Sequence, residues 1–214
     1  MARPLYQVER GVVGRTGARG MTAGMLVLAS ASPRRADLLR SAGVVFTVAA
    51  VDADESWRAG EAAPVYAARV ARAKAALALP HHPGAVVLAA DTTVWHPGEP
   101  PIGKPGDRAE AAAMITDLTA RGSHLVTTAF VLADSRGEVV TWLEEQVTTR
   151  VWMRPIADEL PAYLDSEDWR GKAGGYGIQS RAAGLVTRVE GSYTAVVGLP
   201  LAEVLVALRR IGVG

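Results

Sequence analysis

The sequence Met25-Leu26-Val27-Leu28-Ala29-Ser30-Ala31-Ser32-Pro33-Arg34-Arg35 predicts a short buried strand that turns directly into a helix. Its first five residues are apolar and have the length of a buried strand. Ser32 stands at the N-cap position, Pro33 suits the first helical position, and Gly43 marks the end of the helix. Such a turn presents free backbone N–H groups and the positive end of a helix dipole, so it favours binding of an anion.

The charges in this stretch also favour an anion site. Arg34 and Arg35 lie in the first helical turn, where their positive charge opposes the helix dipole and costs stability unless an anion lies nearby. Ser30 and Ser32 add hydroxyl donors. The alternative is an ordinary capped helix with exposed arginines, but the two unfavourably placed charges favour a phosphate site.

The composition limits the kind of protein. The chain has 214 residues, of which 49% are hydrophobic and 21% charged, and it has no cysteine. This length fits one α/β domain or two small lobes that share a core. The lack of cysteine excludes disulfides, thiolate metal sites and a cysteine nucleophile. No stretch approaches the ~20 apolar residues of a membrane span, and we find no signal peptide, so the sequence predicts a cytoplasmic protein with no membrane partner.

Residues 1–24 are rich in glycine and arginine, have no periodicity, and are predicted to form a disordered extension or to precede the true start. They hold four of the 23 basic residues and one of the 22 acidic residues, so residues 25–214 have a net charge of −2. General nucleic-acid binding depends on clustered positive charge. We therefore expect residues 25–214 to form the folded domain, with no nucleic-acid partner.

Helices and strands alternate along this domain. The apolar runs and turn residues predict strands over 25–29, 44–51, 85–90, 124–133, 139–153 and 185–189. The helical patterns and capping residues predict helices over 33–42, 64–79, 108–118, 155–165 and 201–210. The hairpin formed by 124–133 and 139–153 indicates a mixed rather than a purely parallel sheet.

Acidic residues are the candidates for proton transfer and metal binding. Asp91 ends the apolar run 85–90, and open α/β sheets bind ligands at the carboxyl ends of buried strands. Burial would raise its pKa and a neighbouring cation would lower it, so Asp91 is a candidate base, unless it only caps the turn. The loop Asp52-Ala53-Asp54-Glu55 offers three carboxylates to a hard divalent cation, although such clusters are also common in solvated loops.

Lysine is rare in this chain, which has 20 arginines but only Lys74, Lys104 and Lys172. A lysine among arginines indicates a position that needs a compact, flexible ammonium group. Lys104 lies between glycine and proline, which favour a stiff loop close to a ligand, whereas Lys74 also fits a solvated helix face. Gln179 follows a glycine-rich segment, and its amide could read a nucleotide base. The four histidines are expected to be structural or exposed.

Seven motifs, in the same order, resemble those of the Maf family of nucleotide pyrophosphatases from Met25 to the last helix. They are residues 28–35, 54–55, 71–74, 90–92, 103–105, 172–179, and 191–193 together with 196–200. Each motif alone is modest, but the ordered set is specific. The resemblance implies an elongated, two-lobed α/β fold of the Maf/ITPase type, with a mixed, twisted sheet, an active cleft between the lobes and a homodimer.

The reaction that the resemblance implies cleaves a nucleoside triphosphate between its α- and β-phosphates, with Mg²⁺ or Mn²⁺ as the cofactor. By the family pattern Asp91 is the general base, and Glu55 and Asp91 hold the cation. Lys74 and Lys104 match catalytic cations that contact the triphosphate. The remaining residues that match substrate-binding positions are Ser30, Arg34, Arg35, Thr92 and Gln179.

The resemblance also bears on the base of the nucleotide. Arg34, Thr92 and Gln179 fit members of the dTTP/UTP type rather than the 7-methyl-GTP type, and modified pyrimidine nucleotides are equally compatible. Three features depart from the family: Gly171 stands where aspartate is usual, Ala73 replaces a common glutamate, and the segment 119–124 differs by one residue in spacing. Gly171 is expected to weaken a contact near the site and to blur the substrate preference.

Three other functions remain open from the sequence. The first is a related house-cleaning enzyme that cleaves non-standard purine triphosphates. The second is a regulator of cell division that senses a nucleotide without turnover, although the set of Asp91, Glu55 and two lysines favours catalysis. The third is nucleic-acid binding through residues 1–24, which predicts a salt-sensitive affinity for DNA.

Overall fold

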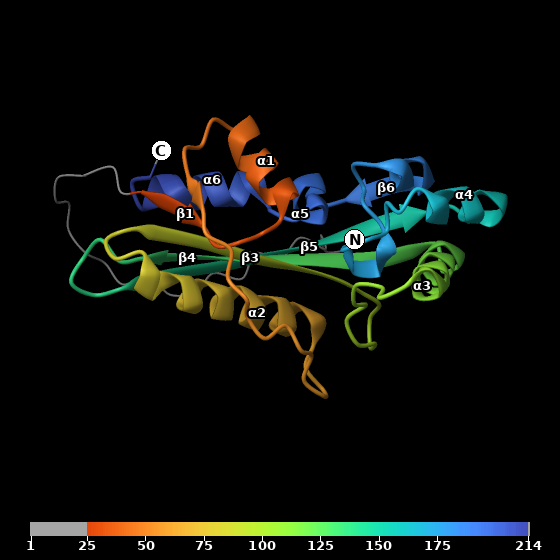
Figure 1. Ribbon diagram of the computed structural model, residues 1–214, viewed down its shortest axis with the longest axis horizontal. Helices are drawn as coiled ribbons and strands as arrows, with labels where there is room; N and C mark the ends of the chain where they lie inside the picture. Colours follow the sequence, from red (N-terminus) through yellow and green to blue (C-terminus); the bar gives the residue numbers. More distant parts are fainter. Residues whose placement is uncertain (1–24, 214) are drawn as a thin grey trace, which may run out of the picture.

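The computed structural model describes residues 25–213 as an elongated α/β protein (Figure 1). The predicted extension over residues 1–24 lies outside the described residues. A six-stranded sheet forms the centre, with the strand order β2-β1-β3-β4-β5-β6. Among the described residues, no helix is both long and apolar enough to cross a membrane.

The sheet is mixed, as predicted. Its parallel part pairs β1 (Leu26–Leu28) with β2 (Thr47–Val48) on one side and with β3 (Val86–Trp95) on the other. The antiparallel part continues from β3 through β4 (Ser123–Asp134) and β5 (Thr141–Met153) to β6 (Val186–Glu190). The predicted hairpin is confirmed, because β4 and β5 pair along their whole length.

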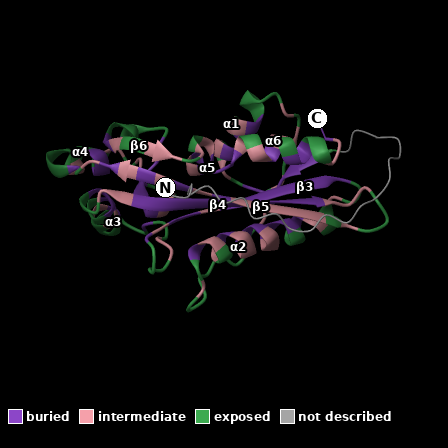
Figure 2. Ribbon diagram, turned by 180° about the vertical axis from the view of Figure 1, so that it is seen from behind, coloured by how far each residue is buried: buried purple, intermediate pink, exposed green. Residues whose placement is uncertain are grey.

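Helices cover both faces of the sheet in the first lobe. The helix α2 (Ala63–Ala78) lies on one face, and α1 (Pro33–Ser41) and α6 (Leu201–Arg210) lie on the other (Figure 1). Each face has its own apolar cluster. The strands β1, β3 and β4 are buried, whereas β5 is intermediate along much of its length, and the outer sides of the helices are exposed (Figure 2).

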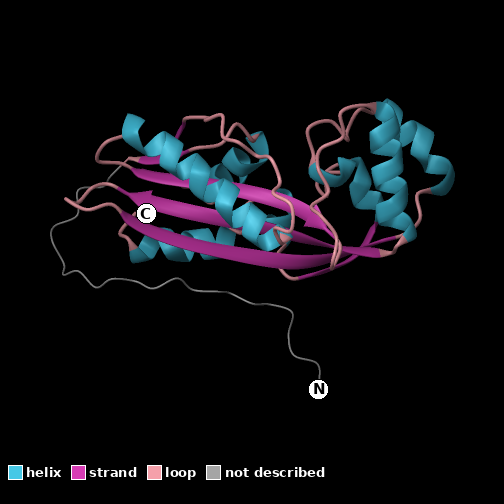
Figure 3. Ribbon diagram, turned by 90° about the horizontal axis from the view of Figure 1, so that it is seen from below, coloured by secondary structure: helices cyan, strands magenta, loops and turns pink. Residues whose placement is uncertain are grey.

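A second lobe lies at the other end of the long strands (Figure 3). It contains α3 (Arg108–Ala120) and α4 (Leu160–Asp165), and it has a separate apolar cluster that includes Ile115, Leu118 and Trp169. The strands β3, β4 and β5 contribute side chains to the clusters of both lobes. The two-lobed α/β architecture is therefore built on one continuous sheet.

Three local predictions were wrong in extent. The strand predicted over 44–51 is reduced to Thr47–Val48, because β2 is an edge strand and its neighbour β1 has only three residues. The strand predicted to stop before Asp91 continues to Trp95, since its second half pairs with β4. The helix predicted over 155–165 is reduced to α4, which follows a 3₁₀ turn at Ala157–Glu159. In addition, a short helix α5 (Tyr193–Val197), capped by the Ser192 hydroxyl, lies in a segment where no helix was predicted.

Two histidines are buried in the second lobe. His124 is 1% exposed, and its Nε2 lies 2.6 Å from the Tyr176 hydroxyl. Its ring also lies edge-on to that of His96, which is buried as well. Burial, together with the neighbouring His96, lowers the pKa of His124 to about 3. The imidazole therefore stays neutral in the folded protein over the whole physiological range.

This neutral histidine makes stability depend on pH. Below pH 6.5 the unfolded chain protonates His124 and the folded chain does not, so the stability is complete above 6.5 and falls as the pH drops towards 3. We expect the free energy of unfolding to fall by about 1.4 kcal/mol per pH unit through this group. His124→Gln should reduce that slope in urea titrations between pH 7.5 and 5. The exposed His81→Gln is the control, and an unchanged slope in His124→Gln would contradict the assignment.

Candidate active site

A cleft of about 840 Å³ lies between the lobes. It forms where β1 ends beside β3: Leu28 pairs with Leu88, and the chain then leaves the sheet at Ser30 to enter α1. Beyond Leu88, the edge of β3 that pairs with β1 has no strand partner among the described residues until Val94 forms a bridge with Ile102. The cleft is lined by all nine residues predicted for the site, namely Ser30, Arg34, Arg35, Glu55, Lys74, Asp91, Thr92, Lys104 and Gln179.

Strand alternation separates the functions of Asp91 and Thr92. Successive side chains of a strand point to opposite faces of a sheet. Asp91 shares the face of Val87 and Ala89, which is covered by α2. Thr92 shares the face of Val86, Leu88 and Ala90, which is covered by α1 and α6. Cations from two helices therefore reach the same short segment of β3 from opposite sides.

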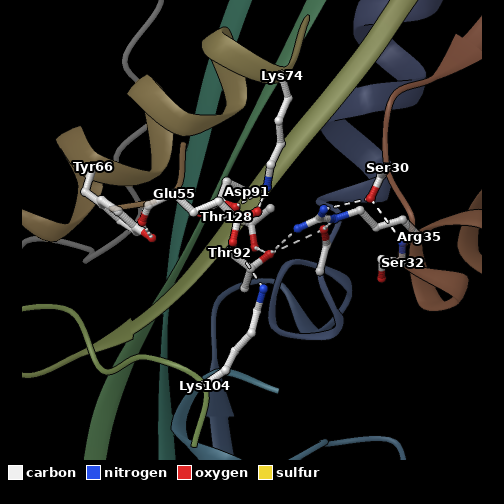
Figure 4. A network of polar contacts seen from close by, with 11 residues as sticks. Ser30, Ser32, Arg35, Glu55, Tyr66, Lys74, Asp91, Thr92, Lys104 and Thr128 are labelled. Atoms are coloured by element: carbon white, nitrogen blue, oxygen red, sulfur yellow. Dashed lines mark hydrogen bonds and ion pairs between the residues drawn. The ribbon is translucent and has the colours of Figure 1, made fainter. Parts of the chain in front are cut away.

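Lys74 is the cation from α2. It follows Ala71 by three residues and precedes Ala78 by four, so it lies on the buried face of the helix. The small alanines bring the helix close to the sheet. The Lys74 ammonium lies 2.8 Å from Asp91 Oδ1 and 2.5 Å from Glu55 Oε1, so one buried cation contacts both predicted catalytic carboxylates (Figure 4).

The two carboxylates have different pKa shifts. Burial raises the pKa of Asp91 above its ordinary value, although Lys74 and Arg35 oppose that shift. Partial burial also acts to raise the pKa of Glu55, but contacts with Lys74 and Lys104 outweigh it and lower the pKa. Glu55 is therefore held as a carboxylate, whereas Asp91 has the greater affinity for a proton.

Glu55 connects the two lobes. Its Oε2 lies 3.1 Å from the Lys104 ammonium, which comes from the loop between β3 and α3. The Tyr66 hydroxyl on α2 donates to the Glu55 backbone carbonyl at 2.8 Å and so fixes the acidic loop. Asp52 and Asp54 of the same loop do not line the cleft, and Asp54 accepts instead from the backbone N–H of Ser56. Of this acidic cluster, only Glu55 reaches the cleft.

Arg35 is buried and held by three neutral acceptors. It donates to the Gly198 carbonyl at 2.8 Å, to Ser30 Oγ at 2.9 Å and to Thr92 Oγ1 at 3.2 Å. Thr128 donates to the Ala195 carbonyl, so it must accept from Thr92, and Thr92 is then free to accept from Arg35. This directed chain of hydroxyls orients the guanidinium without neutralising its charge (Figure 4).

Other predicted ligands of the cleft have free polar groups. Arg34 is partly buried and, within residues 25–213, its guanidinium makes no hydrogen bond or ion pair. Gln179 is exposed and likewise has no polar partner in that part of the chain. Ser32 occupies the N-cap position of α1, but its hydroxyl does not cap the helix; instead Ser30 Oγ accepts from the Ser32 N–H at 3.2 Å. Within residues 25–213 the Ser32 hydroxyl therefore remains available to a ligand, whereas its N–H is already bonded.

The donor set fits a hard divalent cation. Asp91 and Glu55 both contact the Lys74 ammonium, so the two carboxylates lie on the same part of the cleft, and no third carboxylate or histidine of the described residues joins them as a metal-binding group. Mg²⁺ sites in proteins commonly use one or two carboxylates together with substrate phosphates. None of the four histidines, all of which lie in the described part of the chain, lines the cleft. A cation bound in this cleft would therefore have only oxygen ligands.

The predicted site did not include three residues: two that line the cleft and one that supports a lining residue from behind. Lys172 and Asp168 line the cleft and form an ion pair with a distance of 3.2 Å. The rarity of lysine was a signal for Lys172, since all three lysines of the chain line this cleft. Thr128 supports Thr92 from the next strand, and no local pattern distinguishes it from other strand threonines.

The comparison with protein families identifies the chain. The family model described as Maf-like protein matches residues 25–211. The chain belongs to the Maf-like family. Several curated relatives match over most of its length.

Three of these Maf relatives are named dTTP/UTP pyrophosphatase. The protein from Myxococcus xanthus is 48% identical over 88% of this chain and 93% of its own length. The relatives from Roseobacter denitrificans and Geobacter sulfurreducens are each 45% identical, over 88% and 90% of this chain and 97% and 99% of their own lengths. Among solved structures, a HAM1 protein from Coxiella burnetii aligns with 87% of this chain and 99% of its own, with 17% identity and a TM-score of 0.45.

Gly171, which stands where aspartate is usual in the Maf family, occupies a backbone position that suits glycine. Gly171 has a φ of +65°, a conformation that glycine adopts without strain. Lys172 nevertheless has a carboxylate partner, because Asp168 on the preceding loop contacts its ammonium. The glycine therefore does not leave Lys172 unpaired.

Proposed function

We propose that this protein hydrolyses the α–β phosphoanhydride of dTTP and UTP, or of modified pyrimidine nucleotides, to release pyrophosphate and the nucleoside monophosphate. The observation that carries the proposal is the pairing of buried Asp91 with Lys74 inside a cleft lined by further cations. The names of the relatives, at 45–48% identity, support the same reaction and the same substrates.

In the proposed mechanism, Asp91 accepts a proton from the water that attacks the α-phosphorus. Its raised pKa makes it a better base than an ordinary aspartate, while Lys74 keeps enough of it ionised to act. Arg34, Lys104 and the N–H groups at the start of α1 bind the triphosphate. Because phosphoryl transfer depends mainly on positioning and on neutralisation of charge, these groups stabilise the leaving pyrophosphate.

We further propose a divalent cation, Mg²⁺ or Mn²⁺, held by Glu55 and Asp91 together with the phosphates. When bound, such a cation would neutralise phosphate charge in the transition state. We place the enzyme in the cytoplasm, as a homodimer without a nucleic-acid partner. Gln179 is the proposed reader of the base, because an amide can both accept from and donate to a uracil or thymine edge.

The test is pyrophosphate release from a panel of purine and pyrimidine triphosphates in the presence of Mg²⁺ or Mn²⁺. The proposal expects dTTP and UTP to be cleaved fastest. A preference for non-standard purine triphosphates would favour the house-cleaning alternative. Tight nucleotide binding without turnover would favour the regulatory alternative.

Metal removal gives a separate prediction. EDTA should abolish pyrophosphate release, and added Mg²⁺ or Mn²⁺ should restore it. Glu55→Gln should raise the Mg²⁺ concentration needed for half-maximal activity, because it removes a negative ligand. Asp54→Asn is the matched control, since Asp54 lies in the same loop but does not line the cleft. Full activity in EDTA would contradict the metal assignment.

A further inference from the structure

We propose that Asp168 is a positioning residue that determines base specificity, because it holds the turn that presents Gln179 to the cleft. The inference rests on the proposed function, and it assigns a role to an acidic residue outside the motifs of the reaction. Asp168 lies in the loop after α4 and lines the cleft. It does not contact Asp91, Glu55 or Lys74, but its charge acts on Arg34, where it opposes the lowering of the guanidinium pKa by burial.

The Asp168 side chain has three donors. Oδ1 lies 3.2 Å from the Lys172 ammonium. Oδ2 accepts from the Ser180 hydroxyl at 2.6 Å and from the Arg181 backbone N–H at 3.2 Å. The Lys172 ammonium also donates to the Asp168 backbone carbonyl. One carboxylate therefore ties together the start of the glycine-rich segment and the two residues that follow Gln179.

The turn between these anchors is closed and tightly packed. The Ser180 N–H donates to the Gly177 carbonyl at 3.2 Å, while the Ser180 hydroxyl, which lies 3.1 Å from the same carbonyl, gives its one proton to the closer Asp168 Oδ2. A Cβ on Gly177 would lie 2.8 Å from Lys172 Cε and 2.8 Å from Ser180 Oγ. The glycine therefore leaves room for the contacts that Asp168 organises.

Gln179 depends on this turn for its position. It is exposed, lines the cleft and has no polar partner of its own within residues 25–213. Because no polar contact within residues 25–213 holds its side chain, the backbone of the turn determines where that side chain enters the cleft. Asp168 holds that backbone immediately after Gln179, through Ser180 and Arg181.

The residue before Asp168 has a strained backbone conformation. Glu167 has a φ of +56°, which is unfavourable for a residue other than glycine. Such strain persists only where the surrounding structure imposes it, and it is concentrated at functional sites. Asp168 also forms an ion pair with Lys172, as Glu55 does with Lys104 on the same cleft.

The experiment compares kcat and KM of Asp168→Ala with those of the wild type for UTP, dTTP, CTP and ATP. Loss of a hydrogen-bonded support of about 1.4 kcal/mol corresponds to roughly a tenfold effect. We expect KM for UTP and dTTP to rise roughly tenfold, the preference for UTP over CTP to fall by a similar factor, and kcat to change little. Asp165→Ala, at the exposed end of α4, is the matched control and should keep the wild-type values.

Further variants separate positioning from loss of fold. Ser180→Ala removes one contact of the network and should move the UTP/CTP preference in the same direction by a smaller factor. If Asp168→Ala does not fold, Asp168→Asn replaces it in the same comparison. This variant removes the carboxylate charge that pairs with Lys172. An equal loss of kcat on all four nucleotides, or an unchanged preference, would overturn the inference.

Failure of the proposed function has a different result. If the wild type cleaves no pyrimidine triphosphate, the proposed function fails and this inference fails with it. If the wild type cleaves UTP and Asp168→Ala retains its discrimination, only the role of Asp168 is wrong.

Discussion

Asp91→Asn is expected to lower kcat for dTTP and UTP by roughly 10²–10⁴-fold, the range attributed to general acid–base catalysis. Asparagine cannot take the proton from the attacking water, but its amide oxygen can still accept from Lys74 at the position of Oδ1. The fold and nucleotide binding should therefore survive. Single-turnover pyrophosphate release, together with nucleotide titration of the inactive variant, measures the two effects separately.

Asp52→Asn provides the control for this substitution. Asp52 lies three residues before Glu55 but does not line the cleft, so its loss of charge should leave kcat and KM unchanged. If Asp91→Asn kept kcat within a few-fold of the wild-type value, another group would have to accept the proton. The mechanism based on Asp91 would then be wrong.

Lys74→Met is expected to lower kcat/KM by roughly 10²–10³-fold, the cost of removing one charge-stabilising group from an active site. It should also move the acid limb of the pH profile. Without the ammonium, burial acts on Asp91 with less opposition, so its pKa rises further and a higher pH is needed to ionise the base. Profiles of kcat/KM against pH for the wild type and the variant measure the shift.

Lys104→Met separates the two lysines. Lys104 contacts Glu55 but not Asp91, so its removal should lower kcat/KM while the acid limb stays at the wild-type pH. A shift of the limb towards lower pH in Lys74→Met would be inconsistent with Lys74 as the cation that ionises Asp91. An acid limb that moves equally in Lys74→Met and Lys104→Met would also be inconsistent with that assignment.

The position of Asp91 shows what the sequence could and could not predict. The apolar run 85–90 located the strand, and Asp91 was correctly placed beside it. The end of the strand was misplaced, because Thr92 and Thr93 read as a polar turn. They continue the strand since β4 offers partners, including Thr128, whose hydroxyl lies 2.8 Å from that of Thr92. That partner is distant in sequence, and no local pattern reveals it.

The candidate site was predictable where each residue belongs to a local motif. Ser30, Arg34 and Arg35 follow from the strand–turn–helix at the start of the domain, and the structure places all three at the cleft. Asp168 had no such signal. Its partner Ser180 lies twelve residues further along, and the contact depends on how the loop after α4 packs against the glycine-rich turn.

The strands that run through both lobes affect how the enzyme can move. Val94, Val126 and Val151 belong to the apolar cluster of the second lobe, while earlier residues of β3 and later residues of β4 belong to the clusters of the first. Within residues 25–213 the lobes are thus joined by continuous strands, and a rigid-body opening would have to bend three hydrogen-bonded strands. Substrate entry should instead depend on small movements of the surrounding loops, with the catalytic groups preorganised before the nucleotide arrives.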